Sequence, residues 1–267
     1  MIIERCHRCV GNPSCENQVV ATCLPVPFFG DIAKPNLKVV TVGLNPALNE
    51  FYTNGTAKAL SQRLAILQDF NVSTRTDLSD ADVLKAKTRR DGYFTNHERG
   101  WHSYFEKMES VLTRVSPAWT YAFGSAVHID LVACATEKRF GDLSPETKSS
   151  LIGNCREHFV STLSALPNGT MILCDGPRAT RELQTEEMQN MGLHAAMQPA
   201  QLINVRKPGS GDTGWIGELS FQGKKFPFRG WSSQVSQLTA VWRIDLASWI
   251  HGTILPPSSW PPMQARK

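Results

Sequence analysis

The sequence predicts an α/β fold, a three-layer α/β/α sandwich with a mainly parallel central sheet. Short apolar runs rich in β-branched residues alternate with amphipathic stretches of helix length, which is typical of strand–helix–strand units. The 267 residues, 41% of them hydrophobic, are enough to bury a substantial core. We divide the chain into a Cys-rich N-terminal arm, residues 1–30, and a main domain, residues 31–267.

The first half of the main domain contains one predicted strand and two predicted helices. The strand lies at 37–44, where β-branched apolar residues form a run typical of a buried parallel strand. Apolar spacing predicts a helix at 56–70, and the polar stretch 74–96 is expected to be a surface loop. A second helix is predicted at 101–115, and Pro117 ends it.

The second half continues the alternation and adds a hairpin. Strands are predicted at 126–134, 170–174 and 200–205, helices at 151–165, 178–190 and about 235–251, and a strand pair at 219–221 and 225–228. Gln222-Gly223 supplies the turn of that pair, and the Gly-rich stretch 207–217 is expected to be flexible. Ligands of parallel sheets bind beyond the carboxyl ends of the strands, so the loops after Leu44, Cys134 and Phe228 are the candidate site.

The composition limits the classes of protein and partner. The formal net charge of +4 permits DNA binding without requiring it. No stretch approaches the ~20 apolar residues of a membrane span, and the N-terminus lacks the apolar core of a signal peptide. We therefore expect a cytoplasmic monomer with no membrane partner, whose seven cysteines are reduced or metal-bound rather than paired in disulfides.

The first candidate motif follows the first predicted strand. It reads Gly43-Leu44-Asn45-Pro46-Ala47 and continues to Glu50 and Phe51. Gly-x-Asn-Pro directly after a buried strand resembles motif one of the uracil-DNA glycosylase superfamily, whose mismatch-specific and single-strand-selective branches have Asn at this position. The alternative is an ordinary strand-to-turn boundary without a catalytic role.

Two further segments extend the resemblance. Asp130 stands where the superfamily places a polar residue that reads the base, and Cys134 follows it at the spacing of the iron–sulfur branch, which has Asn there. Alternatively, Asp130 only caps the next turn. The segment Trp231-Ser232-Ser233-Gln234-Val235-Ser236 stands where the superfamily has a His-Pro-Ser-Pro-Leu-Ser loop, with Trp231 in place of His. Its alternative reading is a helix start with a serine cap.

The resemblance implies a uracil-DNA glycosylase-like fold and a monofunctional DNA glycosylase, acting on double- or single-stranded DNA. Such an enzyme extrudes the base before it hydrolyses the glycosidic bond. The resemblance assigns Asn45 to holding the attacking water, and Glu50 is either a second water-holding residue or a solvated loop carboxylate. Stabilisation of the departing base would supply most of the rate, and the chemistry requires no cofactor.

The resemblance also divides the remaining residues between base and DNA backbone. Phe51 or Tyr52 would stack on the base unless both belong to the core, and His128 either lines the pocket or is a satisfied core histidine. The predicted base-binding set is Gly43, Leu44, Pro46, Ala47, Phe51, His128 and Trp231. The serines would bind phosphates, and Val235 or Gln234 would fill the gap in the base stack; the predicted DNA-binding set is Ser232, Ser233, Gln234, Val235 and Ser236.

Two residues indicate which base is excised. An ionised Asp130 only accepts hydrogen bonds, so it complements the amino group of cytosine rather than O4 of uracil. Ala47 replaces a bulky Tyr of the uracil-specific members and leaves room beside C5. A 5-modified cytosine, such as the hydroxymethylated or glucosylated cytosine of phage DNA, is therefore the predicted substrate, with a role in antiviral defence.

Other functions stay open at this point. Uracil excision in base-excision repair is the alternative if burial protonates Asp130. A non-catalytic DNA-binding module is a further alternative. A small-molecule hydrolase is the least supported, because no Gly-x-Ser-x-Gly elbow or P-loop is present.

The cysteines allow two metal sites. The arm has C-x₂-C-x₅-C-x₇-C spacing, which suits a structural zinc held by Cys6, Cys9, Cys15 and Cys23. A rival set resembles the iron–sulfur branch and consists of Cys6, Cys9, Cys134 and Cys155. The third alternative is that no metal binds, and Cys174 is expected in the core.

Overall fold

The computed structural model describes residues 3–10, 12–15, 18–52, 63–96, 100–201 and 213–254. These residues form an α/β fold around one mixed sheet of seven strands, in the order β1-β3-β2-β4-β7-β6-β5. The strands are β1 (Phe28–Phe29), β2 (Val39–Gly43), β3 (Ala126–Asp130), β4 (Met171–Asp175), β5 (His194–Gln201), β6 (Thr213–Phe221) and β7 (Lys224–Trp231).

The centre of the sheet is parallel and its two sides are antiparallel. β2 pairs in parallel with β3 and β4, and β4 pairs in parallel with β7. The register places Gly43 opposite Asp130, and Asp175 opposite Trp231. The carboxyl ends of these parallel strands therefore meet at one edge of the sheet, where ligand sites of such folds lie.

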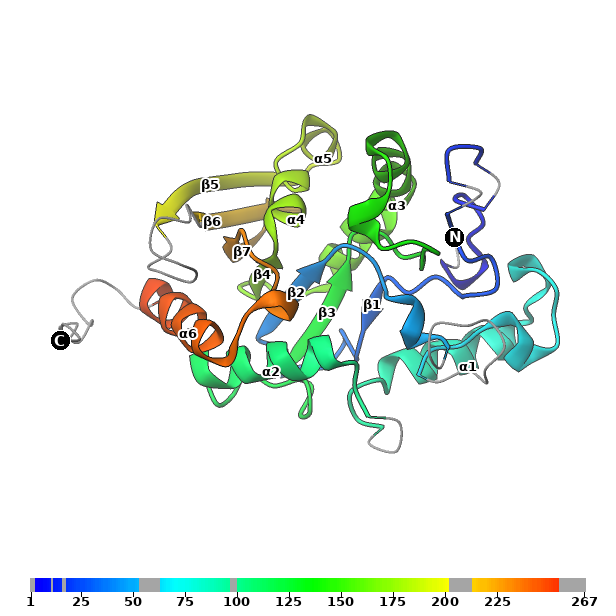
Figure 1. Cartoon of the computed structure of the whole chain (residues 1–267), viewed down its shortest axis with the longest axis horizontal. Coiled ribbons are helices and arrows are strands. Elements are labelled where there is room, and N and C mark those ends of the chain that lie inside the picture. Colours follow the sequence, from blue (N-terminus) through cyan, green and yellow to red (C-terminus); the bar gives the residue numbers. More distant parts are fainter. Residues whose placement is uncertain are drawn as a thin grey trace.

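Helices cover both faces of the sheet. Figure 1 shows α2 (Ser103–Val115) and α6 (Ala240–Ile254) on one side and α3 (Pro145–Ala165), α4 (Pro177–Glu182) and α5 (Glu186–Asn190) on the other. A separate hydrophobic cluster lies under each layer. The predicted α/β class with a parallel sheet centre is confirmed, and the arrangement is compatible with a three-layer sandwich.

Several predicted elements are confirmed. In each, the sequence pattern that predicted the element fits the burial or the backbone conformation that the structure shows. The predicted strands at 37–44 and 126–134 contain β2 and β3, and the one at 170–174 matches β4 except for its last residue, Asp175. The side chains of all three strands are almost all buried. At the predicted hairpin, Gln222 and Gly223 have φ of 50° and 75°. Two successive positive φ values are those of a type I′ turn, which matches the twist of the β6–β7 pair.

The predicted loop at 74–96 is wrong, because α1 (Asp80–Asp91) lies within it. The sequence of this helix is highly charged and shows no clear apolar stripe. Its start is instead marked by a capping box in which the Ser79 hydroxyl accepts a hydrogen bond from the amide of Asp82 and the Asp82 carboxylate accepts from Ser79.

Other predicted boundaries also need correction. The described part of the predicted helix 56–70 holds only a 3₁₀ turn, η4 (Leu67–Phe70), preceded by a β-bridge at Ile66. The predicted helix 178–190 is split into α4 and α5, and β6 already begins within the stretch expected to be flexible. Residues 53–62 and 202–212 lie outside the described residues.

The predicted N-terminal arm is continuous with the sheet. β1 pairs with β3 in antiparallel orientation, and Phe29 packs in the cluster beneath α2. Among the described residues, none of the helices combines the length and apolar character needed to cross a lipid bilayer.

Candidate active site

The predicted site begins where β2 and β3 end side by side. A Cβ added to Gly43 would lie 2.7 Å from both Asp130 Oδ1 and His128 Nε2. Asp130 and His128 therefore project over the bare backbone of Gly43, and any larger residue in place of this glycine would displace them. The glycine of the predicted motif thus makes room for a buried polar pair.

A hydrogen-bond chain fixes the orientation of His128. Its Nδ1 lies 2.7 Å from Thr41 Oγ1, which itself contacts the Tyr121 hydroxyl at 2.6 Å. Its Nε2 lies 3.2 Å from Asp130 Oδ1. A lone pair on Nε2 would repel an ionised carboxylate, so the favoured tautomer carries its proton there and accepts from Thr41 at Nδ1. In this arrangement Oδ1 of Asp130 accepts the hydrogen bond from His128.

Glu50 is a buried carboxylate beside this pair. It belongs to η2 (Leu48–Glu50) and is 2% exposed. The Tyr93 hydroxyl donates to its Oε2 at 2.7 Å, and Arg63 lies 3.7 Å from the same oxygen. Burial raises the pKa of Glu50 to about 7, and the nearby charge of Asp130 acts in the same direction. A carboxyl group that titrates near neutral pH suits general-base catalysis.

His102 is a site residue that the sequence did not identify. It is the N-cap of α2, where its Nδ1 accepts a hydrogen bond from the amide of Tyr104 at 3.2 Å. The same nitrogen lies 3.9 Å from Glu50 Oε1. Burial lowers the pKa of His102, as do the charges of Arg63 and Lys107. The only sequence signal was its position at the start of a predicted helix.

Asp175 is the second residue that sequence reasoning missed. Its Oδ1 accepts hydrogen bonds from the Trp231 indole and from the Val235 amide, each at 2.9 Å. Burial raises the pKa of Asp175 to about 6. The segment 231–236 is therefore fastened to the end of β4 through this carboxylate. A polar residue ending an apolar strand, just before Gly176, was the available signal.

Asn45 lies half-buried in the loop after β2. Its amide nitrogen donates to the Pro46 carbonyl and to Thr136 Oγ1, both at 3.2 Å. Its amide oxygen accepts no hydrogen bond from the described residues. Ala47 is exposed next to it. The side chain is thus held by its nitrogen while its oxygen is free to hold a water molecule.

The predicted stacking aromatics lie in the core. Phe51 and Tyr52 are both 0% exposed and pack in the cluster beneath α2. The Tyr52 hydroxyl is also hydrogen-bonded to Thr22 at 2.6 Å. Neither ring has a free face for a base, so we drop the stacking role that the resemblance implied for them.

The predicted DNA-binding segment is only partly accessible. Val235 is 0% exposed and Trp231 is 1% exposed, because both side chains pack in the hydrophobic cluster beneath α2 and α6. Val235 therefore cannot act as an intercalating wedge, and Trp231 does not form an open pocket wall. Ser233 is also buried, Ser232 and Gln234 are half-buried, and Ser236 is exposed. The Lys107 ammonium donates to the carbonyl of Ser236 at 2.9 Å, which adds a positive charge to this segment. Gln234 therefore remains as the candidate wedge.

The structure brings cysteines of both predicted metal sets together. The thiols of Cys9, Cys134 and Cys155 are mutually hydrogen-bonded, and Cys15 is hydrogen-bonded to Cys9. We call these four, with Cys6 at their border, the thiol cluster. Cys23 lies in a different core cluster with its thiol against Tyr52, and Cys174 is buried in the core as expected. All seven thiols are free.

Arg75 places a buried positive charge beside the thiol cluster. Its guanidinium donates to the carbonyls of Cys6 at 2.9 Å and Cys23 at 2.7 Å, and it lies 3.8 Å from Cys134 Sγ. Hydrogen bonds from Cys155 and Cys9, together with the Arg75 charge, hold the pKa of Cys134 well below its usual range. As the described side chains stand, no group of three or more metal-binding residues has the geometry of a metal site. The lowered pKa nevertheless favours the thiolate form at Cys134.

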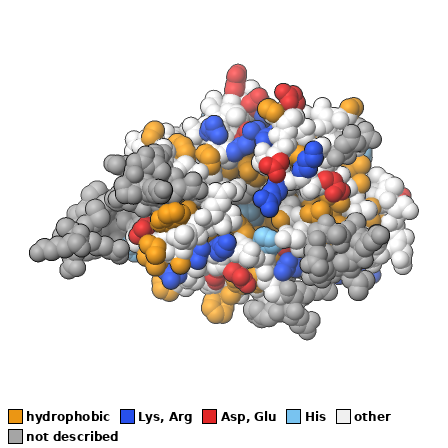
Figure 2. Space-filling model, in the orientation of Figure 1, with side chains coloured by type: hydrophobic (Ala, Val, Ile, Leu, Met, Phe, Trp, Pro, Cys, Tyr) orange, Lys and Arg blue, Asp and Glu red, His pale blue; other side chains and the backbone are white. Residues whose placement is uncertain are grey.

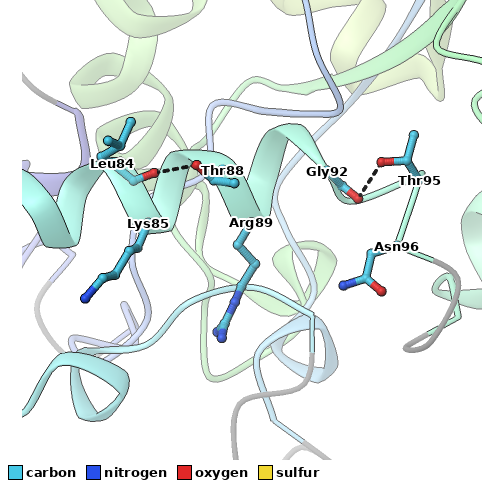
Figure 3. A pocket seen from close by; sticks show the side chains of 7 residues that line it. All are labelled: Leu84, Lys85, Thr88, Arg89, Gly92, Thr95 and Asn96. Atoms are coloured by element: carbon cyan, nitrogen blue, oxygen red, sulfur yellow. Dashed lines mark hydrogen bonds between the residues drawn. The ribbon is translucent and has the colours of Figure 1, made fainter.

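Two shallow depressions of the described surface lie away from the sheet edge. One is on the outer side of α1, where Figure 3 shows the Thr88 and Thr95 hydroxyls turned back onto the carbonyls of Leu84 and Gly92. The other lies on the β5–β6 pair and includes Arg229. Figure 2 shows basic and acidic side chains intermixed over one face of the molecule, around a histidine.

Comparisons with family models, with curated proteins and with solved structures found no match to this chain. The resemblance to the uracil-DNA glycosylase superfamily therefore stays a prediction.

Proposed function

We propose that this chain is a monofunctional DNA glycosylase with a uracil-DNA glycosylase-like fold. The observation that carries the proposal is the convergence of polar groups at the carboxyl ends of the parallel strands. Asp130 and His128 stand over Gly43, Glu50 lies within electrostatic reach of Asp130, and Asp175 fastens the serine segment to the same edge. An extruded nucleotide and a water molecule are the reactants that such a set of groups suits.

The proposed reaction is hydrolysis of the bond between C1′ and N1. The base leaves with the bonding electron pair, and a water oxygen bonds to C1′ on the opposite face of the sugar. The Asn45 amide oxygen positions that water, and Glu50 accepts the proton that the water releases. A pKa of about 7 leaves a large share of Glu50 deprotonated at neutral pH. The base anion takes up, through solvent, the proton that Glu50 releases, so the products are a neutral free base, an abasic site and the regenerated Glu50 carboxylate.

The proposed substrate is a 5-modified cytosine in DNA. Asp130 Oδ1 lies 3.2 Å from His128 Nε2, and a carboxylate at the end of β3 can accept a hydrogen bond from the cytosine amino group. Ala47 is small and exposed beside the motif, so a 5-hydroxymethyl or glucosyl group has room there. In this proposal the enzyme acts as a cytoplasmic monomer that damages modified phage DNA.

The thiol cluster is proposed to hold a structural metal group, separate from the chemistry. A thiolate at Cys134 with two contacting thiols suits zinc or an iron–sulfur cluster. The ligands would be Cys6, Cys9, Cys134 and Cys155, with Cys15 as the alternative to Cys6. The group would join the N-terminal arm to the segment that follows β3 and to the middle of α3.

The test is base release from defined oligonucleotides. Double- and single-stranded DNA would carry one uracil, cytosine, 5-hydroxymethylcytosine or glucosylated 5-hydroxymethylcytosine, and abasic sites would be cut with alkali. We expect release of a modified cytosine by the wild type, and retention of DNA binding without release by Asn45→Ala. Release of uracil alone would overturn the substrate, and DNA binding with no release of any base would favour the non-catalytic module.

A further inference from the structure

Among the described residues, one buried hydroxyl at the sheet edge, that of Tyr104, lies near Asp175 but makes no hydrogen bond of normal geometry. Tyr104 lies in the first turn of α2, and its ring packs against Phe105 and His128 with centroids 5.1 and 5.4 Å away. Its hydroxyl oxygen is buried and makes no hydrogen bond of normal geometry. An unsatisfied buried hydroxyl typically costs about 1–3 kcal/mol, so Phe would be the more stable residue here. A hydroxyl retained at this cost points to a use for it.

The Tyr104 hydroxyl lies close to the carboxylates that end β3 and β4. Burial raises the pKa of Tyr104 well above its usual range, and the charges of Asp175 and Asp130 act in the same direction. The phenol therefore lies near both strand-end carboxylates and keeps its proton at neutral pH. It can donate a hydrogen bond without being a proton-transfer acid.

The side-chain donors of Trp231 and His128 near this edge are already engaged. The Trp231 indole N–H, which stands where the superfamily has a histidine, is bound to Asp175. His128 uses Nε2 on Asp130 and Nδ1 on Thr41. A base that leaves with an electron pair needs a donor close to its O2, and these groups do not supply one.

We propose that the Tyr104 hydroxyl donates a hydrogen bond to O2 of the departing base while the C1′–N1 bond breaks. This inference rests on the proposed glycosylase function and names the residue that stabilises its leaving group. The electron pair of the broken bond stays on the base, whose negative charge is shared between N1 and O2. The proton of Tyr104 remains on its oxygen throughout.

The test is Tyr104→Phe, which removes only the hydroxyl. We expect kcat to fall roughly 100-fold, the effect typical of removing one donor to a developing anion, with KM nearly unchanged. The melting temperature should stay the same or rise, because an unsatisfied group is lost. Tyr52→Phe is the matched control: it breaks a hydrogen bond to Thr22 in the core, so its melting temperature should fall while kcat is kept.

A leaving-group comparison separates this role from a structural one. An electron-withdrawing 5-substituent makes the base a better leaving group, so Tyr104→Phe should lose less on 5-formylcytosine than on 5-hydroxymethylcytosine, or less on 5-fluorouracil than on uracil. An equal loss of kcat in Tyr104→Phe on both substrates of a pair, or an unchanged kcat in this variant, would overturn the role of Tyr104 and leave the proposed glycosylase function standing. Absence of base release by the wild type would instead overturn the proposed function beneath it.

Discussion

Glu50, Asp130 and Asp175 lie at the carboxyl ends of the parallel strands, a region that we call the carboxylate edge. The carboxylate edge and the thiol cluster are both buried and polar, yet the pKa shifts of their groups go in opposite directions with respect to ionisation. At the edge, burial raises the pKa of Glu50 to about 7 and that of Asp175 to about 6. In the thiol cluster, neighbouring thiols and Arg75 lower the pKa of Cys134 despite its burial. The edge thus holds groups that exchange protons near neutral pH, whereas the cluster holds a stabilised anion. The first property suits hydrolysis and the second suits binding of a soft cation.

The two regions also differ in how the chain assembles them. The edge is built where consecutive parallel strands end, so regular sheet geometry places its residues. The thiol cluster joins the N-terminal arm to a loop after β3 and to the middle of α3. Substitutions at the carboxylate edge should therefore mainly lower the rate of base release, whereas substitutions in the thiol cluster should mainly lower the unfolding free energy.

The largest expected effect is that of Glu50→Gln on catalysis. Loss of a general base typically costs 10²–10⁴-fold, so we expect kcat for base release to fall about 1000-fold. Wild-type kcat should fall in acid as Glu50 is protonated, with its midpoint near pH 7. Steady-state rates across pH 5–9 would measure both. The exposed Glu157→Gln, which only loses a surface ion pair to Arg8, should keep wild-type rates. A Glu50→Gln variant with full activity would remove Glu50 from the mechanism.

Cys134→Ser should produce the largest loss of stability. If the cluster holds a structural metal group, the unfolding free energy should fall by more than about 3 kcal/mol, and bound zinc or iron should be lost. Urea denaturation and metal analysis of the purified protein would measure these. Cys174→Ala, at a buried thiol outside the cluster, should keep the metal. Wild-type protein purified without any metal would show that the cluster is an unligated set of thiols.

The same contrast explains what could be predicted from the sequence. Strands β2, β3 and β4 were predictable because runs of apolar β-branched residues indicate burial directly. The positions of Asn45 and Asp130 at the strand ends followed from these strands. Glu50 was identified from a short motif. Asp175 and His102 were missed because single polar residues next to an element carry no sign of what lies opposite them in space.

Burial was the other property that local patterns did not report. Phe51 and Val235 match motif positions that would contact DNA, yet both are fully buried. Whether an apolar residue in a loop faces a ligand or the core depends on long-range packing. The choice between the two cysteine sets depended on the fold for the same reason, since Cys9 is far from Cys134 and Cys155 in sequence.

Arg75→Met should have a moderate effect confined to the thiol cluster. The backbone carbonyls of Cys6 and Cys23 lose their donor, while that of Val20 keeps the Cys23 amide, so the unfolding free energy should fall by about 2 kcal/mol. The pKa of Cys134 should rise, which would weaken metal binding most at low pH. Metal titration at pH 6 and pH 8 would measure this. The exposed variant Arg114→Met, on α2, should leave metal affinity unchanged. Equal affinities in Arg75→Met and wild type would separate Arg75 from the thiolate.

The smallest expected effect is that of Asp175→Asn on the pH dependence of stability. The folded-state pKa of Asp175, about 6, lies above the ordinary aspartate pKa of 3.8, so its contribution to stability is full below pH 3.8 and is lost as pH rises through 6. Asn cannot ionise, and its oxygen can still accept from Trp231 and Val235. The drop in unfolding free energy between pH 5 and pH 8 should therefore shrink by about 1 kcal/mol relative to wild type, with kcat changed less than about 3-fold. Asp142→Asn, at an exposed position away from the edge, serves as the control. An unchanged pH dependence of stability in Asp175→Asn would mean that the two donors keep the Asp175 carboxylate ionised across this pH range. The carboxylate edge would then resemble the thiol cluster, in which the anionic form is favoured.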